Sequence, residues 1–373
     1  METKREHPLI LGIESSCDET AAAVVKDGVE VLANVVYTQI PLHQPYGGVV
    51  PEIASRAHIE KISEVVGTAL GQFAAAQPGG KIDAVAVTYG PGLSPALIVG
   101  LNAAKGLALS LGVPLIGVNH IEAHLHTPFL YEPAADETAP AAGLSPRTAV
   151  PALGLAVSGG HTNWIDMEDY GRYETIGQTL DDAAGEAFDK ASKLLGLGYP
   201  GGPKLDRISR DYLAAHGTKN LIPFPKGRPR EGVTALAGLP ADLCVSFSGL
   251  KTALLHYVQA QGGAERLAAA GEIPRVVASY QEAIVQAIAD RTRTALKRRR
   301  YRAFIVGGGV SLNSRLRTVL TDTAKQAGVP LLLAKPKFCG DNGAMIAGLA
   351  YFRRAYSGEA ALALDVAPSL EVG

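Results

Sequence analysis

The sequence is poor in the residues that mark several classes of protein. It has only three cysteines among 373 residues, Cys17, Cys244 and Cys339, which are widely spaced and odd in number. This favours a reducing compartment over a disulfide framework. Lysine and arginine together number 35 and aspartate and glutamate 36, so the net charge near −1 gives no overall attraction to nucleic acid. A nucleic acid would have to dock on a local basic patch.

Long apolar runs are also missing. The longest, such as "VPLLLA" at 329–334, are far too short to span a bilayer, and the charged N-terminus has no extended apolar stretch. We therefore expect a soluble cytoplasmic protein. The length exceeds that of one typical domain, which predicts two.

Hydrophobic periodicity predicts alternating strands and helices. Residues 9–37 are typical of three strands, 50–73 of a helix, 82–92 of a buried strand, 96–112 of a helix and 113–120 of another strand. The pattern begins again at 150–169 and 301–352 after a linker at 131–147. We interpret this as two similar α/β halves in tandem rather than a chance repeat of common phrases. Ligands of such folds collect at strand ends and in the cleft between paired domains.

Three of the nine histidines lie in one short segment, "VNHIEAHLH" at 118–126. His120 and His124 are spaced i, i+4, so on a helix both imidazoles face the same way and can share a divalent metal. Asp341 follows a strand at the equivalent place in the other half, so we expect the three side chains to meet. Two histidines and one carboxylate with open positions suit Fe(II) or Zn(II) holding a substrate.

Other interpretations of this segment stay open. A lone histidine pair is at least as often structural as metal-binding. A zinc protease would need His-Glu-x-x-His, but Glu122 lies about 200° around a helix from His120 and should point away from a shared ion. Cys339 is a further potential ligand that is better explained as a small buried residue. His126 should lie off the metal-facing side.

Glycine-rich turns and acidic residues form a second group of candidates. "AVSGGHT" at 156–162 joins two predicted strands, and "VGGGVSLN" at 306–313 joins a strand to a helix. Backbone N–H groups of such turns bind phosphates, so we favour nucleotide binding over two ordinary tight turns. Glu14, Asp18 and Glu19 fall in a predicted hairpin turn and Asp189 on a helix, where carboxylates bind ribose, hold a metal–phosphate, act as bases or are simply solvated.

Two basic clusters are the candidates for docking a phosphate backbone. One is "FPKGRPRE", with Lys226, Arg228 and Arg230, and the other is "KRRRYR" at 297–302. Either is equally explained as a solvated face or a helix end.

Eight motifs in order, from about Leu9 to Phe352, give the chain a recognisable resemblance. They are "GIESSCDET", "YGGVVPEIASRAH", "NHIEAHL", "VSGGHT", "DDAAGEAFDKASKLLGLGYPGGP", "VSFSGLKTA", "GGGVSLNSRLR" and "CGDNGAMIA". Together they resemble the bacterial branch of the tRNA N6-adenosine threonylcarbamoyltransferase family, once regarded as O-sialoglycoprotein endopeptidases. The resemblance implies a duplicated actin/sugar kinase/Hsp70-like (ASKHA) fold with two similar lobes around a central cleft. We place the lobes at 8–130 and 150–355, with a helical insertion at about 185–300 and last helices that can return to the first lobe.

The resemblance also implies an activity and its residues. The family transfers threonylcarbamoyl from L-threonylcarbamoyl-adenylate to N6 of adenosine 37 in tRNAs reading ANN codons, which forms t6A and releases AMP. Its metal ligands, with Fe(II) favoured and Zn(II) the alternative, match His120, His124 and Asp341. Its acidic first turn matches Asp18 and Glu19, for which a catalytic role is expected. Its adenylate-binding positions match Ala156, Val157, Ser158, Gly159, Gly160, Asp189, Gly202, Asp206 and Asn313.

The implied partners are tRNA, a paralogous non-catalytic ASKHA protein, a small ATPase and a separate synthase that supplies the adenylate. Extra loops at 132–147 and 232–242 depart from the family pattern without touching a motif. Competing hypotheses are a kinase-like phosphotransferase, a non-catalytic scaffold and, disfavoured by Glu122, a metalloprotease. A kinase of this fold would use Mg²⁺ held by oxygen ligands, which the histidine pair argues against.

Overall fold

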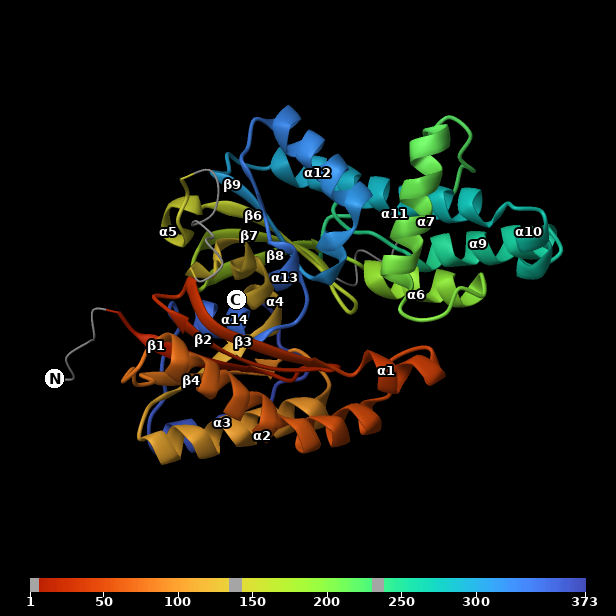
Figure 1. Cartoon of the computed structure of the whole chain (residues 1–373). Coiled ribbons are helices and arrows are strands. Elements are labelled where there is room, and N and C mark those ends of the chain that lie inside the picture. Colours follow the sequence, from red (N-terminus) through yellow and green to blue (C-terminus); the bar gives the residue numbers. More distant parts are fainter. Residues whose placement is uncertain (1–6, 134–142, 230–237) are drawn as a thin grey trace. The chain divides into compact units, whose positions relative to one another are not determined.

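The computed structural model describes residues 7–133, 143–229 and 238–373, and its contacts divide the chain into two units (Figure 1). Unit 1 consists of Met1–Ala149, Asp169–Tyr173 and Leu332–Gly373, and unit 2 of Val150–Glu168 and Glu174–Leu331. The last part of the chain therefore returns to the unit in which the chain begins.

Unit 1 is built on a five-stranded sheet with strand order β3-β2-β1-β4-β5. The strands are β1 (Leu9–Glu14), β2 (Glu19–Lys26), β3 (Glu30–Thr38), β4 (Ala84–Gly90) and β5 (Leu115–Asn119). The helices are α1 (Ile40–His43), α2 (Pro51–Ala76), α3 (Ser94–Leu111), α4 (His120–His126), α5 (Pro146–Ala149), α13 (Pro336–Cys339), α14 (Gly343–Ala350) and α15 (Glu359–Leu362). β1 pairs antiparallel with β2 and parallel with β4.

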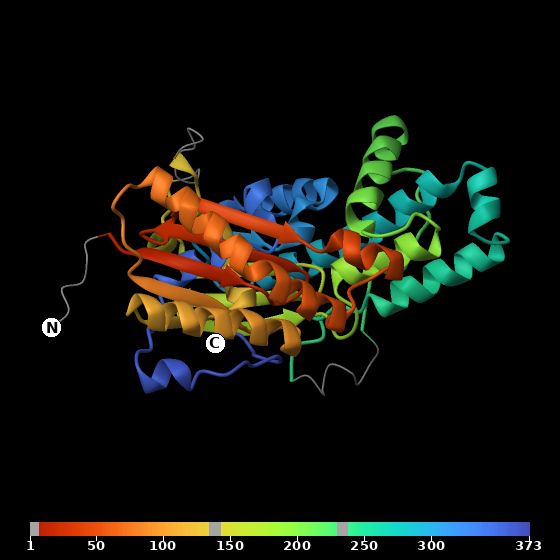
Figure 2. The same ribbon diagram turned by 60° about the horizontal axis from the view of Figure 1, so that its bottom comes forward.

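Alternation along the strands gives this sheet two apolar faces. Leu9, Leu11 and Ile13 of β1 join one core cluster with α2 and α3, which lie along one face of the sheet (Figure 2). Ile10 points the other way, into a cluster with α14. Because both faces are covered, β1 is buried along its whole length, as a strand with a period of two between two helical layers requires.

Helix α14 packs backbone to backbone on β1 and β2. A Cβ on Gly12 would lie 2.5 Å from the Ala347 nitrogen, and one on Gly343 would lie 2.5 Å from the Ala23 nitrogen. Only glycine allows this approach, so these two residues set how closely the start of α14 lies to the sheet.

Unit 2 repeats the same sheet. Its strands are β6 (Ala152–Val157), β7 (Thr162–Asp169), β8 (Arg172–Gln178), β9 (Ala303–Gly307) and β10 (Leu331–Leu333), in the order β10-β9-β6-β7-β8. Read outward from β6, this is the order of unit 1 read outward from β1. β6 likewise pairs antiparallel with β7 and parallel with β9. The predicted duplication is confirmed.

The helices of unit 2 are α6 (Ala184–Leu194), α7 (Gly201–His216), α9 (Ser248–Ala260), α10 (Ala264–Ala269), α11 (Ile273–Leu296) and α12 (Ser314–Ala327). Helix α11 is the central one. It packs on the sheet, where Trp164 of β7 donates a hydrogen bond to Thr292 at 2.9 Å. It also contacts α7, α9 and α12.

Three sequence expectations need comment. The strand expected at 113–120 ends at Asn119, and His120 already begins α4. Most of the linker at 131–147, the first half of the loop at 232–242 and Arg230 lie outside the described residues. The expectation that no apolar stretch is long enough to cross a membrane was wrong for one helix. Helix α3 is long and apolar enough by length and composition, although Asn102 and Lys105 lie within it. Helix α3 packs against β4 and α2.

His126 lies in an aromatic cluster of unit 1 with Phe129, Tyr170 and Phe352. Its Nε2 donates to the Gly28 carbonyl at 2.6 Å, and its Nδ1 lies 3.1 Å from the Tyr170 hydroxyl. Burial lowers the pKa of His126 to about 4, against the hydrogen bond to Gly28 that favours the charged form. The predicted place of His126, away from the metal-facing side, is confirmed.

The glycine contact predicts opposite effects for one chemical change at two sites. Gly12→Ala forces α14 off the sheet and should lower the free energy of unfolding by about 2 kcal/mol. Gly106→Ala, in mid-α3 with nothing within 4 Å of the new Cβ, should raise it by about 0.5–1 kcal/mol. Urea unfolding of both variants measures the difference. A Gly12→Ala protein as stable as Gly106→Ala would contradict the packing account.

The His126 cluster predicts a loss of stability in acid. The pKa of His126 is lower in the folded than in the unfolded protein, where it is about 6.5. The stability that the neutral His126 contributes is therefore complete above pH 6.5 and is lost as the pH falls towards 4. The loss should approach about 3 kcal/mol near pH 4. His126→Gln keeps a donor for Gly28 but cannot titrate, so its urea midpoint should fall less steeply between pH 7 and 4.5. Parallel curves would show that His126 does not titrate with folding.

Candidate metal centre and nucleotide-binding residues

Asn119 starts the helix that carries the two histidines. Its backbone is extended, and its side-chain oxygen accepts hydrogen bonds from the Ile121 and Glu122 amides at 2.9 and 3.2 Å. This N-cap ends β5 and begins α4 at His120. His120 and His124 therefore lie one turn apart on the same side, as their spacing predicted.

A second asparagine places the carboxylate. Asn342 caps α14 by accepting from the Met345 amide at 3.0 Å, and its own amide group donates to the Phe338 and Gly340 carbonyls. Asp341 lies between Gly340 and this cap, at the end of α14 that packs on the sheet. All three candidate ligands belong to unit 1.

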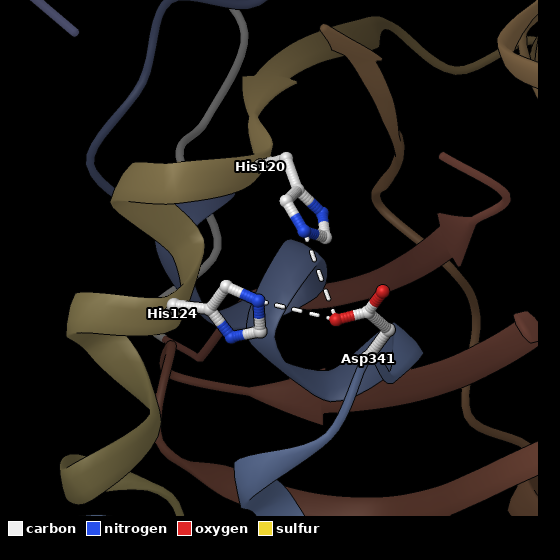
Figure 3. A group of neighbouring side chains, drawn as sticks. All are labelled: His120, His124 and Asp341. Carbon is white, nitrogen blue, oxygen red and sulfur yellow. Dashed lines mark ion pairs between the residues drawn. The ribbon is translucent and has the colours of Figure 1, made fainter. Parts of the chain in front are cut away.

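Figure 3 shows the two imidazoles converging on one carboxylate oxygen. Oδ1 of Asp341 lies 3.1 Å from Nε2 of His124 and 3.7 Å from Nε2 of His120. One ligand atom from each residue lies within 4.8 Å of the others. His120 and His124 are 4% and 1% exposed, while Asp341 is partly open to solvent.

The three residues fit a divalent metal. Ligand atoms at about 2.1 Å from one ion lie about 3.0–3.4 Å apart; the 3.1 Å separation falls in that range, and the 3.7 Å separation is slightly longer. Among the described residues neither ring nitrogen of the buried His124 makes a hydrogen bond, although Nε2 lies 3.1 Å from the Asp341 oxygen; coordination of Nε2 would relieve part of this cost. Nitrogen, nitrogen and carboxylate oxygen are the donor set expected for Fe(II) or Zn(II).

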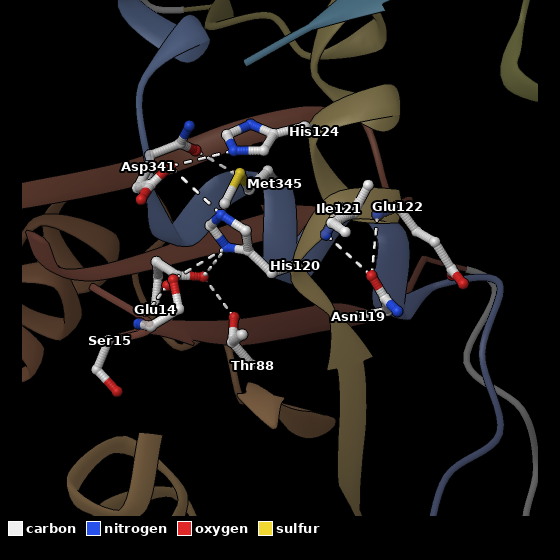
Figure 4. Close-up of polar contacts among 12 residues, drawn as sticks. Glu14, Ser15, Thr88, Asn119, His120, Ile121, Glu122, His124, Asp341 and Met345 are labelled. Carbon is white, nitrogen blue, oxygen red and sulfur yellow. Dashed lines mark hydrogen bonds and ion pairs between the residues drawn. The ribbon is translucent and has the colours of Figure 1, made fainter. Parts of the chain in front are cut away.

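Glu14 contacts His120 on the side of its Nδ1 atom (Figure 4). It is fully buried at the end of β1, where its carboxylate accepts from the Ser16 amide at 2.6 Å and from the Thr88 hydroxyl. Its Oε2 lies 3.2 Å from Nδ1 of His120. Such a contact fixes the imidazole so that Nε2 faces the metal position.

The charges of this buried group depend on one another. Burial would raise the pKa of Glu14, but the nearby His120 holds it below its ordinary value. Burial would lower the pKa of His120, but the Asp341 and Glu14 carboxylates raise it to about 9. The sequence indicates Glu14 only as one acid among several in a predicted turn, and its pairing with His120 is not predicted. A pairing across 106 positions leaves no local signal.

The other residues of the segment lie elsewhere. Glu122 points away from Asp341, as Figure 4 shows, and forms an ion pair with Arg353, so it cannot serve as the base of a zinc protease. Cys339 is buried, with its thiol near the Ala334 and Lys335 carbonyls. It does not belong to the ligand group among the described residues.

Asp18 and Glu19 lie at the turn between β1 and β2, also in unit 1. The Thr38 hydroxyl donates to Glu19 at 3.3 Å. Burial, with the charges of Asp18 and Asp341, raises the pKa of Glu19 well above its ordinary value. Glu19 is thus a carboxylate with increased affinity for a proton.

The predicted adenylate-binding residues all belong to unit 2 and lie on elements that contact one another. The carbonyls of Ser158 and Gly159 accept from the Gly185 and Glu186 amides in the first turn of α6. Asp189 of α6 accepts from the Gly201 amide at 2.6 Å, beside Gly202 at the start of α7. Asp206 of α7 accepts from the amide and hydroxyl of Ser314 at 3.1 and 2.8 Å.

Asn313 and the two exposed glycines of the predicted adenylate-binding set differ in their contacts. Asn313 caps α12 and donates to Gln281 at 2.8 Å. Gly159 and Gly160 are exposed, and a Cβ on either would meet nothing within 4 Å. Within the described part of the chain their amides make no hydrogen bond. Open amides at the end of a strand are suited to an anionic group.

The basic clusters have different supports. Lys226 and Arg228 are exposed on a segment held by the buried Arg291, whose guanidinium donates to the Lys226, Gly227 and Cys244 carbonyls. At the end of α11, Arg299 pairs with Asp166 and Glu168. Its exposed neighbours at 297, 298, 300 and 302 form no ion pair with other described residues.

Two solved structures resemble the chain in fold. HypF from T. kodakarensis aligns with 92% of this chain and 47% of its own, at a TM-score of 0.56 and 15% identity. Full-length HypF in the phosphate- and nucleotide-bound form aligns with 94% of this chain and 47% of its own, at 0.57 and 12%. With the repeated sheet, they confirm the expected ASKHA fold class.

Sequence comparison is more specific. A family model described as TsaD, tRNA N6-adenosine threonylcarbamoyltransferase, matches residues 30–348. A Clostridium perfringens (strain SM101 / Type A) protein of that name is 44% identical over 98% of both chains. One from Anaeromyxobacter sp. (strain Fw109-5) is 48% identical over 91% of this chain and 92% of its own. The chain therefore belongs to the family of tRNA N6-adenosine threonylcarbamoyltransferases.

Proposed function

We propose that the chain transfers the threonylcarbamoyl group from L-threonylcarbamoyl-adenylate to N6 of adenosine 37 in tRNAs reading ANN codons. The N6 nitrogen forms a bond to the carbamoyl carbon, the bond from that carbon to the phosphate oxygen breaks, and AMP leaves. The N6 proton passes to a base. Membership of the family, with the His120, His124 and Asp341 group in place, carries the proposal.

His120, His124 and Asp341 would hold one divalent ion, Fe(II) first and Zn(II) as the alternative, because two histidines and one carboxylate form the facial set typical of Fe(II) sites. Such an ion supplies Lewis acidity and an anchor for substrate oxygens. Glu14 keeps Nε2 of His120 directed at the ion position.

Unit 2 would bind the adenylate. The open amides of Gly159 and Gly160 are suited to the phosphate, which becomes the leaving group. Asp189, Gly202, Asp206 and Asn313 complete the proposed set on α6, α7 and α12. Since the exocyclic amine of adenine is a weak nucleophile, most of the rate must come from positioning and from the leaving group.

Glu19 is the better of the two predicted acids to accept the N6 proton, because burial and the neighbouring carboxylates raise its pKa and so its affinity for a proton. A base works best when its pKa is near the operating pH. Asp18 would act beside it as a charged neighbour that keeps this pKa high.

The tRNA, the partner proteins and the cellular compartment complete the proposal. The substrate tRNA would dock its phosphates on the cations at 297–302 or on Lys226 and Arg228. We propose a cytoplasmic enzyme that works with a paralogous non-catalytic ASKHA protein and a small ATPase, while a separate synthase supplies the adenylate.

The metal assignment predicts that bound metal and transfer activity are lost together. His124→Ala and Asp341→Ala should each reduce bound metal by at least about tenfold and abolish most transfer of labelled threonylcarbamoyl to unmodified tRNA. His256→Ala, which changes an exposed histidine, is the control and should keep both. Metal analysis and the transfer assay are run with the partner proteins present.

Two outcomes would contradict parts of this account. Full transfer by both variants would leave the histidines structural. No transfer by the unaltered protein, but phosphate transfer from ATP to a small hydroxyl, would favour the kinase-like hypothesis. A protein inert in both assays would favour the scaffold.

The proposed base makes a separate prediction. Glu19→Gln should lower kcat by about 10²–10³-fold while bound metal and KM for the adenylate stay near their original values, because only proton transfer is lost. The pH–rate profile should also lose its acidic limb. An unchanged profile would exclude Glu19 as the proton acceptor.

A further inference from the structure

Helix α4 is contacted on two faces, of which only one carries the candidate ligands. Figure 4 shows Asn119 and Glu122 on the side away from His124 and Asp341. A helix of seven residues is not stable alone, so its orientation depends on tertiary contacts on both faces. The opposite face is held by the tail, defined here as Val366–Gly373.

Glu122 is the charged residue of that opposite face. Its side chain is 1% exposed and forms an ion pair with Arg353. Its Oε1 accepts a hydrogen bond from the Gly373 amide at 3.1 Å. A buried carboxylate is tolerated only when it is paired, so the position of Glu122 depends on both contacts.

Asn119 joins the start of α4 to the same tail. While its Oδ1 caps the first amides of the helix, its Nδ2 donates to the Glu371 carbonyl at 2.9 Å. One side chain therefore fixes the helix N-terminus and connects it to the tail.

The tail is itself attached to the sheet of unit 1. The Ala367 amide donates to the Tyr89 carbonyl at 2.7 Å, and the Pro368 carbonyl accepts from the Gly92 amide at 3.1 Å. These bonds fix it at the end of β4. A shift of the tail would therefore be passed to α4 through Asn119 and Glu122.

Close packing does not lock α4 on this side. A cavity of about 160 Å³ remains, lined by Asn119 and Glu122 of the helix side, by Leu370 and Gly373 of the tail, and by Tyr89 and Tyr356. On this side, the polar contacts of Asn119 and Glu122 therefore act in addition to the apolar packing of α4, whose Ile121, Ala123 and Leu125 are buried.

We propose that the tail, acting through Asn119 and Glu122, positions α4 and so sets how tightly His120 and His124 hold their metal. This inference rests on the metal site of the proposed function. It makes Glu122 a positioning residue. Because coupling between two sites is reciprocal, bound metal must in turn hold the tail in place.

The test uses Co(II) as the probe. The affinity for Co(II) and its visible absorption when bound are measured on the full chain and on each variant. Glu122→Gln keeps the shape and one acceptor but loses the charge, and a chain ending at Leu370 loses the Asn119 and Gly373 contacts while keeping those of Ala367 and Pro368. Both should bind Co(II) at least about fivefold more weakly with an altered spectrum. Glu371→Gln, a matched change of an exposed side chain, should match the unaltered protein.

Hydrogen exchange gives the reciprocal measurement. Co(II) should slow exchange of the tail amides in the unaltered chain but not in His124→Ala. Equal affinities in all variants, with tail exchange independent of Co(II), would overturn the inference and leave the metal site intact. No Co(II) binding by the unaltered chain would overturn the metal site as well. If the chain ending at Leu370 does not fold, Glu122→Gln and the exchange measurement decide.

Discussion

The close approach of α14 to β1 and β2 is the constraint on which the candidate metal centre depends. Gly12 and Gly343 remove the side chains that would separate helix and sheet, so backbone meets backbone. Asp341 directly precedes Asn342, which caps that helix and fixes the turn. The carboxylate therefore reaches a depth where α4 can present His120 and His124 to it.

Three groups of residues around this contact have different roles in the site. The imidazoles and Asp341 are the candidate ligands, and Glu14, itself held by Ser16 and Thr88, fixes the orientation of His120. Behind α4, Glu122 and Asn119 meet the tail. The two buried carboxylates lie on opposite faces of one short helix, and each has its own partner. The arrangement makes the orientation of α4 a property of the whole unit.

Local signals were enough to predict much of this structure. Alternation gave β1 its two buried faces, i, i+4 spacing put His120 and His124 on one side of a helix, and the repeated phrases indicated a duplicated sheet. The position of Asp341 after the repeated strand indicated it as the third ligand, and the resemblance to a family pointed to the same residue. Glu14 was visible as an acid at a strand end, but its pairing with His120 is tertiary. The tail contacts were equally invisible, because Gly373 and Glu371 act through their backbones.

The central claim is that His120, His124 and Asp341 bind one divalent metal. Anomalous diffraction from crystals of the protein, recorded on either side of the iron and zinc absorption edges, tests it most directly. The account predicts a single strong peak about 2.1 Å from Nε2 of both histidines and from a carboxylate oxygen of Asp341. A crystal with no peak there, grown with either metal supplied in excess, would contradict it.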